Sequence, residues 1–101
     1  MLILLSLKQK DCYGYEISQM VKEKTAGMFE IKEGVMYPLL HNLLENKYIT
    51  SFDQIVNRRI RVYYHIEEQG EFYLSKLFQD FNQKVLVIQK LYREGNKGND
   101  G

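Results

Sequence analysis

Two β-prone runs follow directly after an amphipathic helical segment, and no other feature of the chain restricts its fold as strongly. The runs are "YITSFDQI" and "RRIRVYYHI", with "VN" between them, in residues 48–66. In the second run, polar and aromatic side chains alternate with an apolar series from Ile60 to Ile66, which is typical of a strand with one buried and one exposed face. The sequence therefore predicts a hairpin whose tip is residues 54–58.

The helical segment before the hairpin, "EGVMYPLLHNLLENKYI" (33–49), contains a proline. At 100° per residue, five apolar side chains share one face, namely Met36, Leu39, Leu40, Leu43 and Leu44. Because this face continues beyond Pro38, the proline cannot end the helix, although it removes one backbone N–H donor. We therefore expect the helix to begin near Gly34 or Val35, with Pro38 in about its first turn, where N–H groups lack helical partners.

The first 27 residues contain two further helical runs. Residues 2–8 are almost all apolar, and residues 13–24 place apolar side chains on one side and charged ones on the other. The stretch "MFEIK" (28–32) alternates apolar with polar residues and predicts a short strand. Two helices, a short strand, a helix and two strands, in this order, are the elements of a winged helix-turn-helix. We therefore predict an α+β, mostly helical fold, with this DNA-binding domain in residues 1–66.

Residues 67–93 contain no proline and predict one long C-terminal helix, with Glu67 and Glu68 at the positive end of its dipole. Apolar side chains recur in it at near 3.5-residue spacing, at Leu74, Leu77, Phe78, Phe81, Val85, Ile88, Leu91 and Tyr92. A domain of this size cannot cover such a stripe, and burying each side chain is worth roughly 1.5–3 kcal/mol. We therefore expect a homodimer in which this helix packs on its copy and on the partner's first helix. Packing within one chain is the alternative.

The last residues, 94–101, are rich in glycine and asparagine and predict a disordered tail. The apolar start of the chain, "MLILLSL", is too short to span a membrane and is expected to be a buried first helix.

The outward face of the proline-containing helix predicts a contact with DNA. In helix-turn-helix proteins the second helix of the motif enters the major groove, and its first residues meet base edges. The side chains available here are Tyr37, Pro38, His41 and Asn42, with Lys32 just before the helix to meet a phosphate.

An arginine cluster on the hairpin strengthens this prediction. Arg58, Arg59 and Arg61 lie at the tip and in the second strand, where a wing meets the DNA backbone or minor groove. Taken singly, the helix face and the arginines each also fit an ordinary solvated surface. Together and in this order, they predict double-stranded DNA, with two-fold sites for a dimer, as the partner.

Composition argues against several other classes of protein. The net charge is only +1, so a prediction of nucleic-acid binding has to rest on local clusters of basic side chains. The single cysteine, Cys12, allows no internal disulfide, is expected to be buried, and fits a cytoplasmic protein. His41 and His65 lie far apart, so no metal spacing is visible, and no phosphate loop or nucleophile–base pair stands out. We therefore expect neither an enzyme nor a cofactor.

Three stretches resemble the PadR family of transcriptional regulators. They are "GYEI" (14–17), "GVMYPLLHNLLENKYI" (34–49) and "RRIRVYYHIEEQG" (58–70), and the single C-terminal helix resembles the smaller PadR subfamily. The resemblance implies a dimeric winged-helix repressor, often autoregulatory, of genes for coping with phenolic acids or exported drugs. It also implies that Tyr37 and Pro38 lie at the DNA-facing end of the helix.

The chain departs from the family pattern at several positions. Asn42 stands where a basic residue is common, and Glu67 stands where threonine usually opens the last helix. The chain has no tryptophan, and Phe81 occupies the position where some small members stack flat aromatic drugs. A ligand pocket is expected at the dimer centre, between Phe78, Phe81 and Val85.

The function predicted from these observations is a sequence-specific repressor that is relieved by a small, aromatic ligand. A winged-helix protein-interaction module without specific DNA binding is the alternative, favoured by the near-neutral charge and by Asn42.

Overall fold

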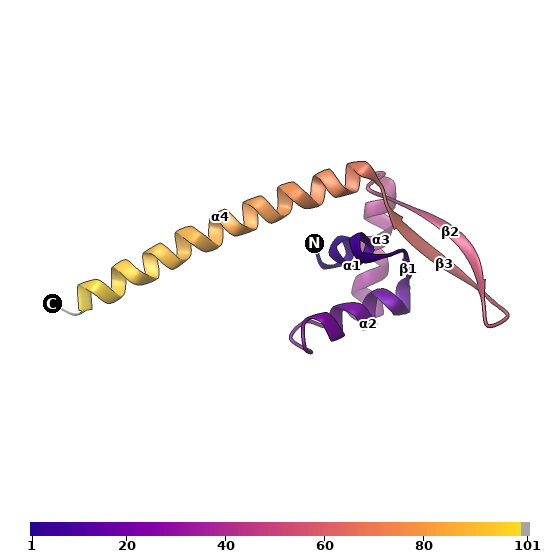
Figure 1. Ribbon diagram of the computed structural model, residues 1–101, viewed down its shortest axis with the longest axis horizontal. Helices are drawn as coiled ribbons and strands as arrows, with labels where there is room; N and C mark the ends of the chain where they lie inside the picture. Colours follow the sequence, from indigo (N-terminus) through magenta and orange to yellow (C-terminus); the bar gives the residue numbers. More distant parts are fainter. Residues whose placement is uncertain (100–101) are drawn as a thin grey trace.

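The computed structural model describes the backbone of residues 1–99, with a winged-helix body from which one long helix projects (Figure 1). Its elements are α1 (Leu2–Gln9), β1 (Cys12–Tyr13), α2 (Gly14–Lys24), α3 (Glu33–Glu45), β2 (Ile49–Val56), β3 (Arg59–Ile66) and α4 (Glu68–Asn99). The predicted α+β fold, a winged helix-turn-helix with a long C-terminal helix, is thereby confirmed. Among the described residues, no helix combines the length and the apolar character that crossing a bilayer requires.

The wing is the antiparallel hairpin of β2 and β3, which pair from Ile49 with Ile66 out to Val56 with Arg59. Asn57 and Arg58 connect the strands and both have positive φ, 50° and 66°. A two-residue turn of this kind matches the natural twist of a hairpin, and asparagine tolerates its left-handed backbone better than most residues do. The predicted hairpin is confirmed, but the tip is shorter than residues 54–58.

The third strand of the sheet is β1, not the predicted strand at residues 28–32. β1 pairs with β3 through Cys12 with Tyr64 and Tyr13 with Tyr63, which gives the sheet order β1-β3-β2. The 28–32 stretch is instead irregular, because the Thr25 hydroxyl accepts the Phe29 N–H at 3.1 Å and holds the chain in a turn. Alternating polarity was a misleading signal there, since the free edge of β3 is already taken by β1.

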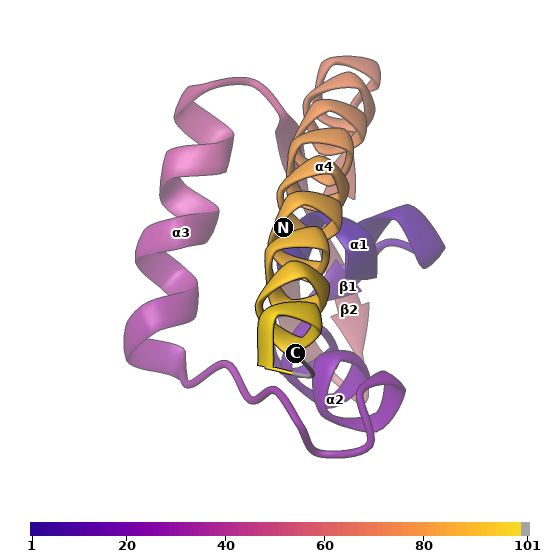
Figure 2. The same cartoon turned by 90° about the vertical axis from the view of Figure 1, so that its left-hand side faces the viewer.

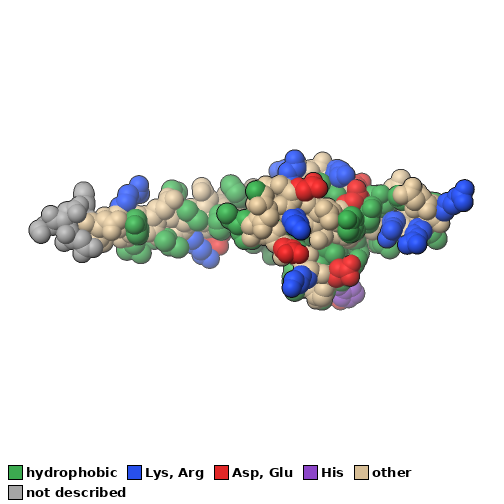
Figure 3. All heavy atoms as spheres, turned by 90° about the horizontal axis from the view of Figure 1, so that it is seen from below, with side chains coloured by type: hydrophobic (Ala, Val, Ile, Leu, Met, Phe, Trp, Pro, Cys, Tyr) green, Lys and Arg blue, Asp and Glu red, His purple; other side chains and the backbone are tan. Residues whose placement is uncertain are grey.

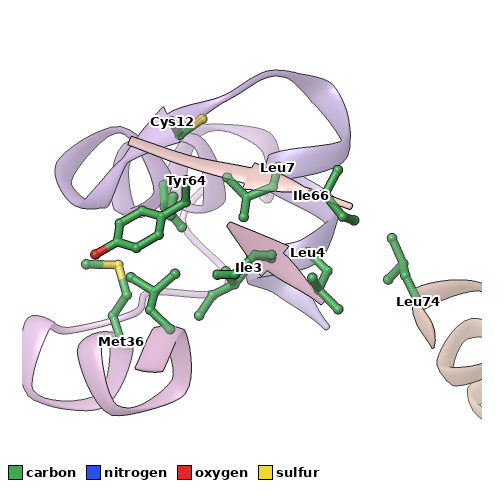
Figure 4. Packing of buried hydrophobic residues seen from close by; sticks show 11 residues of the cluster. Ile3, Leu4, Leu7, Cys12, Met36, Tyr64, Ile66 and Leu74 are labelled. Atoms are coloured by element: carbon green, nitrogen blue, oxygen red, sulfur yellow. The ribbon is translucent and has the colours of Figure 1, made fainter. Parts of the chain in front are cut away.

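The core lies between α1, α2, α3 and the sheet, and Leu74 borders it from α4 (Figure 4). Ile3, Leu4 and Leu7 of α1 are buried, as the apolar first run predicted. Cys12 is fully buried, and burial raises the pKa of its thiol to about 11, so the thiolate form is disfavoured at neutral pH. These contacts hold α3 and the wing in a fixed arrangement within the winged-helix body.

The first turns of α4 belong to this body. Leu74 is only 3% exposed and packs in the protomer's own core, so the expectation that it contacts a partner subunit is wrong. Its neighbour Tyr73 stacks on Tyr48, with ring centroids 4.2 Å apart, at the junction between α3 and β2. The spacing of apolar residues could not distinguish Leu74 from the later residues of the stripe. The same face of α4 packs on the protomer's core in the first turns and extends beyond the core in the later turns. The start of α4 therefore packs against the core of the winged-helix body.

Beyond these turns, α4 leaves the body (Figure 1). The apolar side chains of its stripe, such as Phe81 and Ile88, are exposed there. Seen along α4, α3 and α1 lie on opposite sides of it (Figure 2). The helix continues through residues 94–99, where the sequence predicted a disordered tail, because extending an existing helix needs no new nucleus. Residues 100–101 of the predicted tail lie outside the described residues.

α3 begins at Glu33, slightly earlier than predicted, so Pro38 lies in its second turn. A proline there leaves the carbonyl of Gly34 without its helical donor. Gly34 is exposed, so water can satisfy this oxygen. The predicted buried face is confirmed for Met36 and Leu40 but wrong for Leu39, which is 48% exposed.

An ion pair ties β3 to the segment between α1 and β1: His65 Nδ1 lies 2.6 Å from Asp11 Oδ1. The hydrogen bond to Asp11 raises the pKa of His65 and outweighs the opposing effect of burial, and the negative charges of Asp11, Glu67 and Glu71 raise it further. Both side chains are nearly half exposed, so the pair is worth only a few tenths of a kcal/mol.

This pair predicts a pH-dependent term in stability. Because the folded pKa lies above the unfolded value of about 6.5, the stabilisation is fully present below that value and is lost as pH rises through the folded pKa. We expect His65→Gln to lower the free energy of unfolding by about 0.5 kcal/mol at pH 5.5 and by less at pH 8.5. Urea unfolding at both values measures this, with Asp11→Asn as a second variant. An equal loss at both pH values would show that protonation of His65 is irrelevant.

Candidate nucleic-acid interface

A hollow of about 490 Å³ joins the start of α2, the start of α3 and the strand β3. Three tyrosines of the two helix starts, Tyr13, Tyr15 and Tyr37, face it together with Arg61 of the wing. We call this hollow the tyrosine cleft; its lining is completed by Gly14, Glu33, Ile60, Val62 and Tyr64. It collects phenol hydroxyls and one guanidinium, which can donate hydrogen bonds, together with the carboxylate of Glu33, which accepts them.

The start of α2 is fixed beside the cleft by a charged side chain. Glu16 Oε1 accepts the backbone N–H of Tyr13 at 3.3 Å, and Glu16 Oε2 accepts from Lys10 Nζ at 3.1 Å. A carboxylate in the first helical turn also interacts favourably with the helix dipole. The hydrogen bond to Glu16 raises the pKa of Lys10, which stays charged at neutral pH.

Aromatic contacts hold Arg61 in place on the wing. Its guanidinium carbon lies 5.3 Å from the centre of the Tyr13 ring, within range of a cation–π interaction. Tyr13 in turn meets Tyr63 edge-on at 5.3 Å, and Phe52 of β2 stacks on Tyr63 at 5.6 Å. The arginine is therefore positioned by a chain of rings that runs across all three strands.

The other wing arginines extend the positive charge outward. Arg58 lies in the turn, Arg59 lies at the start of β3, and both are exposed. Lys and Arg side chains gather at the wing end of the molecule in Figure 3. The wing thus presents a basic end although the whole chain is nearly neutral.

The predicted α3 residues divide between two sides of the helix. Tyr37 turns toward the wing and lines the tyrosine cleft, while Lys32 and Asn42 line a different, largely apolar groove on the other side. Pro38 and His41 are exposed, and His41 Nε2 lies 3.1 Å from Glu45 Oε1. The predicted set is therefore not one continuous patch.

Gly14 is needed where it is because the Tyr37 ring lies over it. A Cβ at this position would lie 2.6 Å from the Tyr37 hydroxyl oxygen and 3.1 Å from the adjacent ring carbon. No side chain fits there unless the ring moves. Gly14 is thus a positioning residue for Tyr37.

Sequence reasoning missed Gly14, Tyr13 and Tyr15 as members of this site. The stretch "GYEI" (14–17) contributed only to the resemblance to the PadR family, and Tyr13 only to the predicted helix at residues 13–24. The available signal was the density of tyrosines at the start of a helix that crosses DNA in helix-turn-helix proteins.

Comparison with known proteins gives the family. Residues 3–76 match the model of the family described as the transcriptional regulator PadR-like family. The chain belongs to the PadR-like family of transcriptional regulators. The family is one of regulators and not of enzymes. Among the described residues of this PadR-like chain, no group of three or more His, Cys, Asp or Glu side chains is arranged to hold a metal ion.

Solved structures agree with this assignment. The PadR-like chain is similar to a transcriptional regulator from Clostridium thermocellum, with 34% identity, a TM-score of 0.82, and coverage of 88% of this chain and 87% of the other. It is similar to a PadR family transcription regulator from Clostridium difficile, with 32% identity, a TM-score of 0.78, and coverage of 89% and 93%.

The fold is also that of Bacillus subtilis PadR, which was solved in complex with operator DNA. The TM-score is 0.68 at 24% identity, over 76% of this chain and 43% of that one. At this identity the likeness concerns the fold.

Proposed function

We propose that this protein is a homodimeric, sequence-specific DNA-binding repressor of transcription. The observation that carries the proposal is the tyrosine cleft, because it joins the start of α3 to the start of α2 and to the basic wing. These are the three elements that a winged helix-turn-helix uses on DNA. Operator DNA bound to the Bacillus subtilis PadR, which shares the fold, gives independent support.

Each part of the interface has a separate task in this proposal. The exposed side chains of α3, Pro38 and His41 with Asn42 at the edge, meet base edges in the major groove. Arg59 and Arg61 meet phosphates or the minor groove, and the hydroxyls of the tyrosine cleft donate to phosphate oxygens. The contacts with the DNA backbone provide affinity for DNA of any sequence, while the contacts of α3 with base edges provide sequence preference.

A salt titration of DNA binding tests the wing. Arg59→Ala and Arg61→Ala are each expected to weaken binding to all sequences and to lower the slope of log K against log salt by about 1. Arg93→Ala, on the exposed distal part of α4, is the matched control and should leave the slope unchanged. Unchanged slopes for both wing variants would rule out the wing as a phosphate contact.

Asn42→Ala tests whether Asn42 contributes to recognition of the DNA sequence. Its side-chain oxygen accepts from Asn46 Nδ2 at 3.3 Å, so its amide N–H groups are the donors offered to a base. We expect the variant to bind the preferred site less tightly and to discriminate less against altered sites. Equal discrimination by the variant and the wild type would remove Asn42 from the reading face.

Gly14→Ala tests the tyrosine cleft without touching a charged group. The added methyl group has to displace the Tyr37 ring, so we expect about tenfold weaker DNA binding with the fold retained. Binding is measured by fluorescence anisotropy and folding by circular dichroism. Gly34→Ala is the control, because a Cβ there meets nothing within 4 Å. Wild-type affinity in Gly14→Ala would exclude Tyr37 from the contact.

The exposed stripe of α4 supports the homodimer and the site for an effector. Phe78 and Phe81 are about half exposed in one chain, and Val85 lies beside them. We propose that a small, flat aromatic ligand binds between the two copies at these residues and releases DNA. Addition of such compounds to the protein–DNA complex should release DNA from the wild type but not from Phe81→Ala.

A protein-interaction module without DNA binding is the second candidate, because the net charge is only +1 and Glu33 and Glu45 flank the exposed face of α3. This candidate predicts that no DNA sequence is enriched from a random pool.

A further inference from the structure

The outer half of the wing carries an apolar face that its own chain leaves uncovered. Ile55 of β2 lies opposite Ile60 of β3, and these side chains are 74% and 70% exposed. Val62 is 45% exposed and lies on the same side of the sheet as Ile60, because side chains alternate along a strand. We call these three side chains the wing apolar face. Contiguous exposed apolar side chains mark contact surfaces more often than single ones do.

The wing apolar face is continuous with the tyrosine cleft. Ile60 and Val62 line this cleft together with Tyr37 of α3. Tyr64, the next residue of β3 on this side of the sheet, belongs to the buried core, so the face lies on the side of the wing that is turned toward the body. The face therefore extends the proposed DNA interface from α3 outward along the wing.

The charged side chains around the face match DNA better than they match an apolar protein surface. Arg58 and Arg59 lie at the end of the wing beside the isoleucine pair, and hydrophobic and basic side chains lie together at this end in Figure 3. Phosphates match the arginines, while deoxyribose offers carbon atoms to the apolar side chains. Asp53 lies opposite Val62 on the same face and repels phosphate, so the phosphates are expected near the tip.

The wing is too wide for the minor groove of undistorted DNA. The backbones of two paired strands lie about 4.8 Å apart before side chains are counted, whereas the minor groove of B-DNA is only about 6 Å wide. A hairpin that carries isoleucines therefore enters this groove only where the groove is widened. The cost of widening depends on sequence, because A-tracts are stiff and narrow while pyrimidine–purine steps deform easily.

We propose that the wing apolar face packs on the deoxyriboses of a widened minor groove beside the bases that α3 contacts. The inference rests on the proposed DNA binding and adds a specificity determinant. The isoleucine pair selects flanking sequences by their deformability, without hydrogen bonds to base edges. Apolar side chains of other minor-groove proteins open and bend the duplex in a comparable way. Because this contact releases no counterions, it adds affinity that hardly depends on salt.

A salt titration of the double variant Ile55→Thr/Ile60→Thr tests the contact. Threonine favours a strand as isoleucine does, so the wing is retained, and circular dichroism with urea unfolding checks this. The variant should bind the site selected by the wild type about tenfold more weakly, with an unchanged slope of log K against log salt. Arg59→Ala, in contrast, should lower that slope by about 1.

Met28→Ala is the matched control for the loss of an exposed apolar side chain. Met28 is 80% exposed and belongs to the loop after α2, and this loop lies on the side of the body away from the wing (Figure 1). Its affinity for DNA should equal that of the wild type.

Flanking sequences give a second readout. In the selected site, the steps beside each half-site are replaced either by an A-tract or by TA and CA steps. The wild type should bind the A-tract version about fivefold more weakly, and Ile55→Thr/Ile60→Thr should bind the two versions about equally. Equal binding of both versions by the wild type would show that the wing does not widen the groove and would overturn the inference.

Two results of the salt titration would also overturn it. Wild-type affinity of the double variant at every salt concentration would leave the wing apolar face to a protein partner. A lower salt slope for the double variant would show that displaced arginines, and not a lost apolar contact, weaken the binding. In each of these cases the proposed function stands, whereas failure of the wild type to bind any DNA site would overturn both.

Discussion

Replacing Gly70 by alanine is expected to lower the free energy of unfolding by about 3 kcal/mol or more. A Cβ at this position would lie 2.1 Å from the Tyr48 carbonyl oxygen and 2.9 Å from its carbon, both backbone atoms that cannot swing away. The same carbonyl oxygen accepts the Glu67 N–H at 3.0 Å. The methyl group would therefore push the start of α4 off the junction between α3 and β2.

Gly34→Ala is the matched control for Gly70→Ala. Gly34 is also helical, but no atom lies within 4 Å of its added Cβ. Since alanine favours a helix over glycine by about 1 kcal/mol, stability should be unchanged or slightly raised. Urea unfolding followed by circular dichroism compares the two variants. Wild-type stability of Gly70→Ala would mean that the first turn of α4 does not rest on Tyr48.

The double variant Phe81→Asp/Ile88→Asp is expected to be a folded monomer with at least a hundredfold weaker operator binding. Both side chains are exposed in one chain, so the charges leave the protomer's core intact. In a dimer they would bury carboxylates in an apolar seam, which costs several kcal/mol for each unpaired charge. A monomer contacts only one half-site of the operator. It therefore binds the operator more weakly than a dimer, in which the second DNA-binding domain is held near the second half-site at a millimolar effective concentration.

The control for this variant is Gln79→Asp/Gln83→Asp, which adds the same charge to α4. At 100° per residue these exposed positions lie on the side of α4 opposite the stripe. Light scattering should give twice the chain mass of 12.0 kDa for the wild type and the control, and a single chain mass for Phe81→Asp/Ile88→Asp. A dimeric Phe81→Asp/Ile88→Asp would place the dimer contact elsewhere.

Much of the fold was predictable because its main elements have strong periodicity. The alternation in β3 and the leucine face of α3 gave the order of elements and hence the winged helix. β1 was not predictable in this way, since a strand of two residues has no period. The stretch at residues 28–32 had the alternation but pairs with no strand, because both edges of β3 are taken by β1 and β2, and pairing partners are set by the tertiary fold.

The candidate site was less predictable, because helical position alone does not say what a neighbouring element covers. Tyr37 and Asn42 were assigned to one outward face, yet they line different hollows on two sides of α3. Leu39 has the position of a core residue but faces a groove that one chain leaves open. Leu74 has the position of a dimer contact but is buried in its own protomer. Each of these differences depends on where α4 or the wing lies relative to α3.

Selection of DNA by the purified protein from a random double-stranded pool at about 0.1 M salt is the most direct measurement of what this protein does. We expect enrichment of a two-fold symmetric site with half-sites about one helical turn apart, bound at least a thousandfold more tightly than unrelated DNA. Failure to enrich any sequence, or equal binding of all sequences, would contradict a sequence-specific regulator that reads DNA with α3 and the wing.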